Sequence, residues 1–242
     1  MPLKLFVDFD GTITRNDVGN DFFHTFGGPR CEVFVREYRE GGLSAVECFC
    51  REAAAVGHIN RREVIDFFRS QPLDGSFSKL VRFCRECGIE LTVLSDGLDY
   101  YIREIFETHG IRDVRVVANE ARFVPDSGLP TARLELRFPY TDAECIRCAC
   151  CKRNLILTES GDDDMLAYVG EGYSDTCPVQ YVDIVFAKDD LQRFCRKENI
   201  SYYPYSDFLD VISRLKGLMK DGKHLRRRRR AELKRREAFL RE

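Results

Sequence analysis

Residues 3–14, LKLFVDFDGTIT, join a short apolar run to a group of polar side chains. The first five of these residues have the length and composition of a buried β-strand, and Gly11 marks a turn after it. Asp8 and Asp10 stand one residue apart at the end of this strand. Two carboxylates this close raise each other's pKa unless a positive group lies between them. The stretch is therefore either a solvated acidic turn or a site for a metal ion and a phosphate group.

The chain from Phe77 onward alternates between strand and helix patterns. Strands are expected within 89–97, 165–172 and 183–188, and helices within 77–88, 98–110, 189–199 and from Ser206. Residues 115–138 predict a hairpin that turns at 126–128, where Asp-Ser-Gly separates two strand patterns. Alternating strands and helices with right-handed crossovers predict an α/β fold with a Rossmann-like parallel sheet core, covered by helices on both faces.

Residues 15–75 have a different pattern, which predicts a compact helical insert. Ser44 with Glu47 forms a capping-box pattern before one apolar helix, and Asn60 with Glu63 marks the start of another. The sequence thus predicts three parts. These are a core of residues 1–14 and 76–222, an inserted helical cap of residues 15–75, and a basic C-terminal tail of residues 223–242.

The 242 residues, 44% of them hydrophobic, suffice for one large domain or for a core domain with an insert. No apolar run approaches the length of a membrane span, which is about 18 residues or more. The N-terminus shows neither a long apolar segment nor a small-residue cleavage site, so no signal peptide is expected. The eleven cysteines are therefore expected to be reduced thiols of a cytoplasmic protein.

The net charge of −2 hides an uneven distribution. From Arg214 onward the chain holds 13 lysines and arginines against 4 acidic residues, so the preceding body carries a net charge of −11. An acidic body argues against nucleic-acid binding. The tail, with five arginines at 226–230, is expected to be a solvated terminal helix, and binding of an acidic partner is the alternative.

Three of the expected strands end in polar turns, in VDFDGT, VLSDG and VGEGYSD. Ligands of open α/β sheets bind beyond the carboxyl ends of the strands, so these turns are expected to meet. Carboxylates gathered there need a cation, and oxygen ligands favour Mg²⁺. The side chains expected at this place are Asp8, Asp10, Ser95, Glu171 and Asp175. Backbone N–H groups suited to phosphate oxygens come from Gly11, Thr12 and Gly97.

The order of these motifs resembles that of the haloacid-dehalogenase-like (HAD) phosphatases. DFDGTIT is similar to their first motif, VLSDG to the second and GEGYSD to the fourth, and Lys152 in CCKRN fits the lysine of the third. The helical insert resembles the cap of the phosphoserine-phosphatase-like branch. Within that branch the chain resembles the methionine-salvage phosphatases, in the run CIRCACCK and in residues 182–208.

The resemblance implies a Mg²⁺-dependent phosphomonoester hydrolase that acts on a small phosphorylated metabolite through an aspartyl phosphate. Asp8 would be the nucleophile and Asp10 the general acid and base, while Ser95 and Lys152 would hold the phosphate. The implied metal ligands are Asp8, Asp10, Glu171 and Asp175. Glu171 departs from the family pattern, because the fourth motif usually begins Gly-Asp and a longer side chain would shift the ion or the backbone.

The substrate stays open at this stage. The resemblance implies the methylthio-ketose enol phosphate of methionine salvage, and phosphoserine or phosphocholine is the alternative, because the insert holds both arginines and phenylalanines. Asp17 and Asn20, at the start of the insert, either touch the leaving group and set substrate specificity or cap a helix. The alternative from another class is a non-catalytic binding protein that uses the basic tail. The sequence does not indicate an oligomeric state.

Cys145, Cys148, Cys150 and Cys151 precede Lys152 with a spacing that also occurs in zinc sites. Two of the four are adjacent, which hinders tetrahedral coordination of one ion. A structural turn that shapes the loop before Lys152 is therefore favoured over a zinc site.

Overall fold

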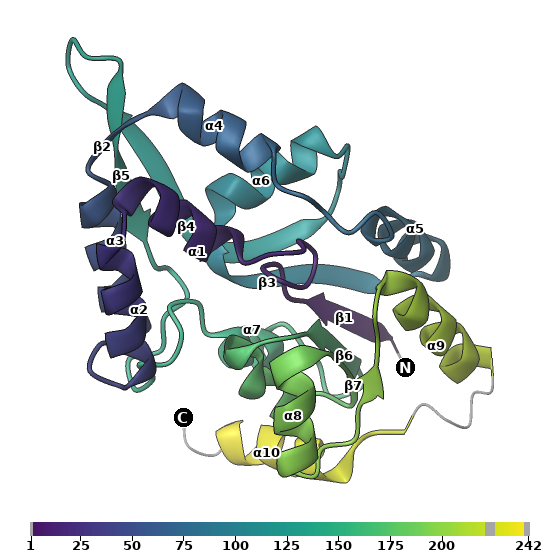
Figure 1. Cartoon of the computed structure of the whole chain (residues 1–242). Helices are drawn as coiled ribbons and strands as arrows, with labels where there is room; N and C mark the ends of the chain where they lie inside the picture. Colours follow the sequence, from purple (N-terminus) through teal and green to yellow (C-terminus); the bar gives the residue numbers. More distant parts are fainter. Residues whose placement is uncertain (1, 221–225, 240–242) are drawn as a thin grey trace. The chain divides into compact units, whose positions relative to one another are not determined.

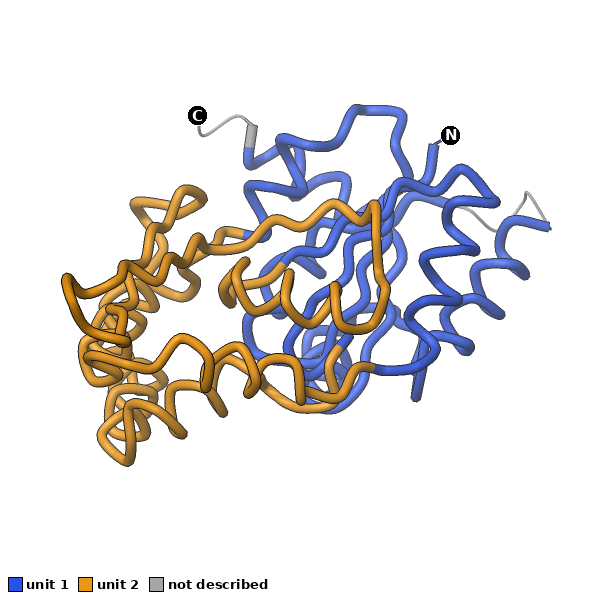
Figure 2. The backbone as a smooth tube through the Cα atoms, turned by 90° about the horizontal axis from the view of Figure 1, so that it is seen from above, with its two compact units in different colours: residues 1–13, 74–94, 152–242 blue, residues 14–73, 95–151 orange. Residues whose placement is uncertain are grey.

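The structure is a computed structural model that describes residues 2–220 and 226–239. Contacts within the chain divide it into two compact units, drawn in blue and orange in Figure 2. Unit 1 comprises Met1–Ile13, Asp74–Leu94 and Lys152–Glu242, and unit 2 comprises Thr14–Leu73 and Ser95–Cys151. Across the described residues, every helix falls short of the length and apolarity that crossing a bilayer takes.

Unit 1 is built on parallel strands that run in the order β3, β1, β6, β7 and β8. Their bounds are Glu90–Leu98 for β3, Leu3–Val7 for β1, Met165–Gly170 for β6, Ile184–Ala187 for β7 and Tyr203–Pro204 for β8. Only the part of β3 up to Leu94 belongs to unit 1. Val7, at the end of β1, lies opposite Val93 of β3 and Val169 of β6. The predicted α/β fold is confirmed, and this register brings Asp8 to the same sheet edge as the end of β6.

Unit 1 also contains helices, which are labelled in Figure 1. They are α5 (Phe77–Cys87), α7 (Lys152–Thr158), α8 (Asp189–Lys197), α9 (Phe208–Lys220) and α10 (Arg229–Phe239), with short 3₁₀ turns at Tyr173–Thr176 and Pro178–Gln180. α5 and α9 lie side by side, and the rings of Phe77 and Phe208 are 5.2 Å apart between centroids. Both rings are fully buried.

The basic tail is helical where the structure describes it, but α10 is not simply solvated. Ala231 is fully buried. Arg235 forms an ion pair with Asp183 at 3.2 Å and donates to the carbonyl oxygen of Tyr181 at 2.6 Å. The expectation of a solvated terminal helix is therefore corrected for residues 226–239, whereas residues 221–225 and 240–242 lie outside the described residues.

Unit 2 contains the predicted hairpin and most of the predicted helical insert. β4 (Arg115–Pro125) and β5 (Thr131–Arg137) pair antiparallel, and a third strand, β2 (His58–Asn60), pairs with β5. The helices are α1 (Val18–Gly27), α2 (Arg30–Arg39), α3 (Ala45–Val56), α4 (Arg61–Arg69) and α6 (Asp99–Thr108). The capping box of Ser44 and Glu47 is present at the start of α3. A cluster of phenylalanine rings, which includes Phe22 and Phe68 at 5.0 Å between centroids, joins α1 to α4.

Glu52, on α3, is a buried carboxyl group with 5% of its surface exposed. Burial and the charge of Asp17 raise the pKa of Glu52 to about 8, although a hydrogen bond with Cys48 lowers it. The ordinary value is 4.5, so at neutral pH the folded protein holds a proton that the unfolded chain releases. This difference makes the free energy of unfolding fall as pH rises between those two values.

Glu52→Gln is expected to remove this pH dependence, because glutamine cannot titrate. The wild type should lose up to about 1.4 kcal/mol per pH unit on account of Glu52 in the middle of the range from pH 5 to pH 8, and the variant should lack that slope. Urea denaturation at pH 5, 6, 7 and 8 measures the difference between the two proteins. Glu86→Gln, at an exposed position on α5, is the control. A difference between wild type and Glu52→Gln that stays constant with pH would contradict the raised pKa.

Candidate active site

The turn after β1 fixes the direction of Asp8. The N–H of Asp8 donates to the carbonyl oxygen of Val169 at 2.9 Å, which continues the pairing of β1 with β6. The N–H groups of Thr12 and Ile13 both donate to the carbonyl oxygen of Phe9 at 3.2 and 2.8 Å. Gly11 has a φ of +69°, a conformation that suits glycine. The backbone thus reverses direction after β1, while the side chain of Asp8 stays at the carboxyl end of the strand.

Lys152 lies between the two buried carboxylates of unit 1. Its Nζ donates to Asp8 Oδ1 at 2.6 Å, to Asp175 Oδ1 at 2.8 Å and to Ser174 Oγ at 3.1 Å. Lys152 is 1% exposed, Asp8 is 5% exposed and Asp175 is fully buried. A positive group beside Asp8, the first aspartate of the first motif, is therefore supplied by a residue 144 positions later in the chain.

Burial and charge set the protonation of this cluster. Burial raises the pKa of Asp8, the neighbouring Asp175 raises it further, and Lys152 opposes both effects. For Lys152, burial lowers the pKa, but the charges of Asp175 and Asp8 outweigh burial, so its pKa is raised overall. Lys152 therefore stays positively charged at neutral pH and compensates the negative charge of the two carboxylates.

The carboxylate of Asp175 accepts four hydrogen bonds. Oδ1 accepts from Lys152 Nζ and from the hydroxyl of Tyr168 at 2.6 Å. Oδ2 accepts from the backbone N–H groups of Glu171 at 2.9 Å and Gly172 at 3.0 Å. Two acceptor sites on each oxygen are thus occupied. This geometry makes Asp175 the group that holds Lys152 and the turn after β6, while its predicted role as a metal ligand stays a prediction.

Gly170→Ala is expected to disturb this carboxylate, because an added Cβ would lie 2.4 Å from Asp175 Oδ2 and 2.8 Å from the Tyr168 ring. Overpacking of this kind costs about 1–3 kcal/mol of the free energy of unfolding. Urea denaturation measures the loss. Gly172→Ala is the matched control, since nothing lies within 4 Å of its added Cβ. An equal loss in the two variants would contradict the close packing of Asp175 on Gly170.

Glu171 extends its side chain over the turn after β1. A Cβ added at Gly11 would lie 2.9 Å from Glu171 Oε1, so the carboxylate lies directly against this glycine. Asp8 Oδ2, on the same turn, accepts a hydrogen bond from Thr12 Oγ1 at 3.2 Å. The longer side chain of Glu171, in the fourth motif, thus reaches Gly11 of the first motif. Carboxylate oxygens of Glu171 and Asp8 therefore both lie at the turn after β1.

Among the described residues, no group of three or more histidine, cysteine, aspartate or glutamate side chains is arranged as a metal site. Magnesium at phosphate-binding sites commonly takes only one or two protein carboxylates, and water and substrate oxygens complete its shell. Asp8 and Glu171 offer such carboxylates at the turn after β1. The donor chemistry therefore fits a hard divalent cation.

The second motif belongs to unit 2. Ser95 Oγ accepts from the N–H of Gly97 at 2.9 Å, and both residues lie within β3. Asp96, the residue between Ser95 and Gly97, accepts from the N–H groups of Ala149 and Cys150, each at 2.7 Å, and so anchors the segment just before Lys152. The predicted phosphate-binding roles of Ser95 and Gly97 stay predictions.

Asp17 acts as the N-cap of α1, where its Oδ1 accepts from the N–H of Asn20 at 2.8 Å. One of the two interpretations of this pair, helix capping, is therefore confirmed. Contact of Asp17 or Asn20 with a substrate stays a prediction.

The cysteine-rich turn shows no metal-site arrangement in the part of the chain that the structure describes. A hydrogen bond with Cys151 and burial raise the pKa of Cys148, so this thiol is protonated at neutral pH. The N–H of Cys151 donates to the carbonyl oxygen of Tyr140 at 2.7 Å. These contacts support the interpretation of a structural turn ahead of Lys152.

Two residues of the cluster carried no signal in the sequence. Tyr168 lies inside an apolar strand pattern, and its hydroxyl becomes informative only through its bond to Asp175. Ser174 is one of several small polar residues in a turn, and its contact with Lys152 joins positions 22 residues apart. The neighbouring carboxylate Asp175, in contrast, belongs to GEGYSD, the fourth motif, which predicts it as a site residue.

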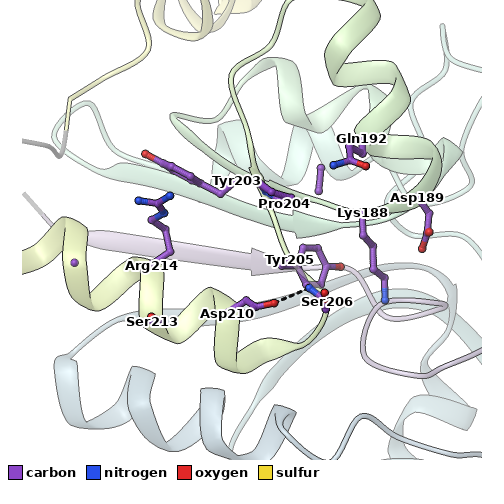
Figure 3. Close-up of a pocket in the computed structure, with 12 residues that line it drawn as sticks. Lys188, Asp189, Gln192, Tyr203, Pro204, Tyr205, Ser206, Asp210, Ser213 and Arg214 are labelled. Carbon is purple, nitrogen blue, oxygen red and sulfur yellow. Dashed lines mark hydrogen bonds between the residues drawn. The ribbon is translucent and has the colours of Figure 1, made fainter.

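An open groove of about 680 Å³ adjoins the end of β6 within unit 1 (Figure 3). Lys188 and Tyr205 are among its lining residues, and the N–H of Lys188 and the hydroxyl of Tyr205 both donate to the carbonyl oxygen of Gly170, at 3.4 and 3.3 Å. Arg214 and Tyr203 also line the groove, and the guanidinium of Arg214 lies 4.3 Å from the ring centre of Tyr203. The groove therefore offers charged and aromatic surface beside the strand that leads to Glu171.

Comparisons with known proteins agree on one kind of protein. A family model described as Putative Phosphatase matches residues 3–198. The 2-hydroxy-3-keto-5-methylthiopentenyl-1-phosphate phosphatase of Geobacillus kaustophilus (strain HTA426) is 29% identical over 216 residues, which cover 88% of this chain and 95% of that protein.

Solved structures share the fold. A HAD family hydrolase from Salmonella enterica subsp. enterica serovar Typhi has a TM-score of 0.64 at 13% identity, covering 88% of this chain and 72% of that one. A phosphoserine phosphohydrolase-like protein from Francisella tularensis subsp. tularensis SCHU S4 has a TM-score of 0.63 at 17% identity, covering 88% and 99%. The fold that the resemblance to HAD phosphatases implies is therefore confirmed.

Proposed function

Since the chain belongs to the Putative Phosphatase family and is a phosphatase, we propose that it hydrolyses the phosphomonoester of a small metabolite through an aspartyl phosphate on Asp8. The observation that carries this proposal is the position of Lys152, whose Nζ lies 2.6 Å from Asp8 Oδ1 and is held in place by Asp175. A buried ammonium beside the nucleophile is placed to stabilise charge on a transferring phosphoryl group.

In the first half-reaction, a carboxylate oxygen of Asp8 attacks phosphorus while the bond to the leaving oxygen breaks. Asp10 donates its proton to that oxygen, so an alcohol leaves, or an enol when the substrate is an enol phosphate. In the second half-reaction, Asp10 takes a proton from the water that attacks the aspartyl phosphate, and Asp8 and inorganic phosphate are released. Lys152, Ser95 and the N–H groups of Gly11, Thr12 and Gly97 would hold the phosphoryl oxygens.

Asp8, Asp10 and Glu171 would hold Mg²⁺, and Asp175 would support this shell by orienting Lys152 and the turn at 171–172. When bound, the ion would shield the repulsion between the carboxylate of Asp8 and the incoming phosphate.

For the substrate we propose the compound in the name of the Geobacillus relative, 2-hydroxy-3-keto-5-methylthiopentenyl-1-phosphate. The similarity covers nearly the whole length of both chains, which supports a shared substrate class. Phosphoserine is the second candidate, because solved structures of the same fold include a phosphoserine phosphohydrolase-like protein. The helices within residues 15–75, with Asp17 and Asn20 at their start, would act as the cap that selects the leaving group.

A panel of phosphomonoesters tests this function. Phosphate release from the methylthiopentenyl phosphate, phosphoserine and phosphocholine should be measured with Mg²⁺ and again with EDTA. We expect the first compound to give the highest kcat/KM and EDTA to abolish turnover. A higher kcat/KM for phosphoserine would make phosphoserine the substrate in place of the methylthiopentenyl phosphate. Turnover that persists in EDTA would contradict the metal requirement.

Glu171→Gln is expected to raise the Mg²⁺ concentration needed for half-maximal rate by at least about tenfold, because one carboxylate leaves the metal shell. Glu171→Asp, which carries the usual residue of the family motif, should stay near the wild type. Titration of Mg²⁺ at saturating substrate measures both variants. An unchanged Mg²⁺ requirement in Glu171→Gln would show that this residue is not a ligand.

A further inference from the structure

A second, smaller cavity lies in unit 1 where α10 packs on the rest of the unit. Its volume is about 110 Å³, and its lining includes Arg228, Arg230, Lys234 and the polar residues Asn199 and Ser201. Three cationic side chains thus line the cavity, and no carboxylate is among its lining residues. Pockets for drug-sized molecules measure about 300–1,000 Å³, so this cavity fits one small group.

Arg228 is the cation of this cavity that has two side-chain nitrogens buried without a partner among the described residues. Its Nη2 donates to the carbonyl oxygen of Val179 at 2.5 Å. Its Nε and Nη1 are buried, and neither has a hydrogen-bond partner within residues 2–220 and 226–239. A buried donor without an acceptor costs about 1–3 kcal/mol, and more when it carries charge. Arginine does not escape this cost by losing its proton, since its guanidinium stays charged in proteins.

Asp183 is the carboxylate that contacts the backbone of Arg228, but its side chain is already paired with another arginine. Asp183 accepts from the backbone N–H of Arg228 at 3.1 Å, and its carboxylate is paired with the guanidinium of Arg235 at 3.2 Å. Asp183 raises the pKa of Arg228, which burial lowers more strongly. The side-chain Nε and Nη1 of Arg228 are therefore left for an acceptor that comes from outside these residues.

The remaining cations are fixed around the same cavity by neutral acceptors. Arg230 Nη1 donates to the carbonyl oxygen of Glu198 at 2.8 Å, and Lys234 donates to the side-chain oxygen of Gln180. α10 begins at Arg229, so the N-terminal end of an 11-residue helix, with its partial positive charge, lies beside Arg228 and Arg230. Every charge on the cavity wall thus has the sign that attracts an anion.

We propose that this cavity binds a tetrahedral oxyanion of the phosphate type, held by Arg228, Arg230 and Lys234. Guanidinium N–H groups form short, strong hydrogen bonds with phosphate oxygens, and Nε with Nη1 of Arg228 would supply two of them. The occupant would connect α10 to the segments that hold Gln180 and Asn199, and so tie the basic tail (yellow in Figure 1) to the core of unit 1. The site is separate in its residues from the cluster around Asp8.

Hydrogen exchange of the α10 amides tests the site locally, on the full chain, with inorganic phosphate as the probe. Phosphate should slow exchange in α10 by about tenfold or more relative to chloride at equal ionic strength. Arg228→Gln and Arg230→Gln should each raise the phosphate concentration of half-maximal protection by about tenfold or more. Arg236→Gln, on the same helix but outside the cavity lining, should leave it unchanged.

Methylphosphonate, whose P–C bond a phosphatase does not hydrolyse, serves in a second titration as a mimic of an esterified phosphate, and protection by either anion supports the site. If chloride protected the α10 amides as much as phosphate does, the protection would be due to general screening of the positive charges, and the proposal would be overturned. An unchanged midpoint in both Arg228→Gln and Arg230→Gln would also overturn it. Circular dichroism confirms that each variant is folded, and Arg230, which is exposed, provides the variant with the smaller structural risk.

Discussion

Asp8→Asn is expected to lower kcat by at least about 10³-fold, which is the scale on which enzymes lose activity with their nucleophile. Asparagine has nearly the same shape as aspartate, but its amide does not form the acyl phosphate that the proposed mechanism requires. Its side-chain oxygen can still accept from Lys152, whose Nζ lies 2.6 Å from Asp8 Oδ1. The variant should therefore keep the fold while it loses the reaction.

The free energy of unfolding of Asp8→Asn shows whether the variant loses activity without losing its fold. Burial raises the pKa of Asp8, which shows that its charged form is disfavoured at this position. Removal of that charge leaves Lys152 paired with Asp175 at 2.8 Å, so one cation still faces one carboxylate. We expect the free energy of unfolding of Asp8→Asn to equal or exceed that of the wild type, as measured by urea denaturation.

The activity test uses Asp10→Asn as its matched partner. Asp10→Asn should slow both half-reactions, because proton transfer by this residue contributes about 10²–10⁴-fold in comparable enzymes, but it retains the nucleophile. ¹⁹F NMR with beryllofluoride should detect an Asp8 adduct in the wild type and in Asp10→Asn, and none in Asp8→Asn. A near-wild-type rate for Asp8→Asn would exclude the covalent mechanism.

Lys152→Met is expected to destabilise the protein by about 3–5 kcal/mol, because it leaves Asp8 and Asp175 as uncompensated buried charges. For a chain of this size, the loss corresponds to a decrease in Tm of about 6–20 °C. Methionine keeps much of the volume of the lysine stem, so the effect reports the charge and its hydrogen bonds more than a cavity. Turnover should fall as well, since the phosphoryl group loses its ammonium.

Two further variants show whether charge is the cause. Lys79→Met, at an exposed position on α5, makes the same substitution outside the cluster and should change stability by less than about 0.5 kcal/mol. Asp175→Asn in the Lys152→Met background removes one of the uncompensated charges and should recover part of the loss. Differential scanning calorimetry measures all of them. A loss in Lys152→Met no larger than that in Lys79→Met would contradict a charge-compensated cluster.

Local patterns in the sequence predicted most elements of this protein. The apolar run before Asp8, the hairpin at 115–138 and the capping box at Ser44 depend on neighbours within a few residues, and the structure contains all three. The first and fourth motifs also located Asp8 and Glu171 at the ends of β1 and β6. These features were readable because strand period, turn chemistry and helix caps are short-range properties.

The tertiary structure alone decided which groups meet. Lys152 reaches Asp8 across 144 residues, and the register of β1 with β6 is what brings Asp175 and the hydroxyl of Tyr168 to the same lysine. The packing of α10 likewise gave a run of arginines, which reads as a solvated charge cluster, a structural role: Ala231 of the helix is buried, and Arg228, just before the helix, has two buried side-chain nitrogens. Sequence patterns describe which face of an element is apolar, whereas contacts between distant segments depend on how those faces pack, and a charged side chain becomes buried or exposed only at that step.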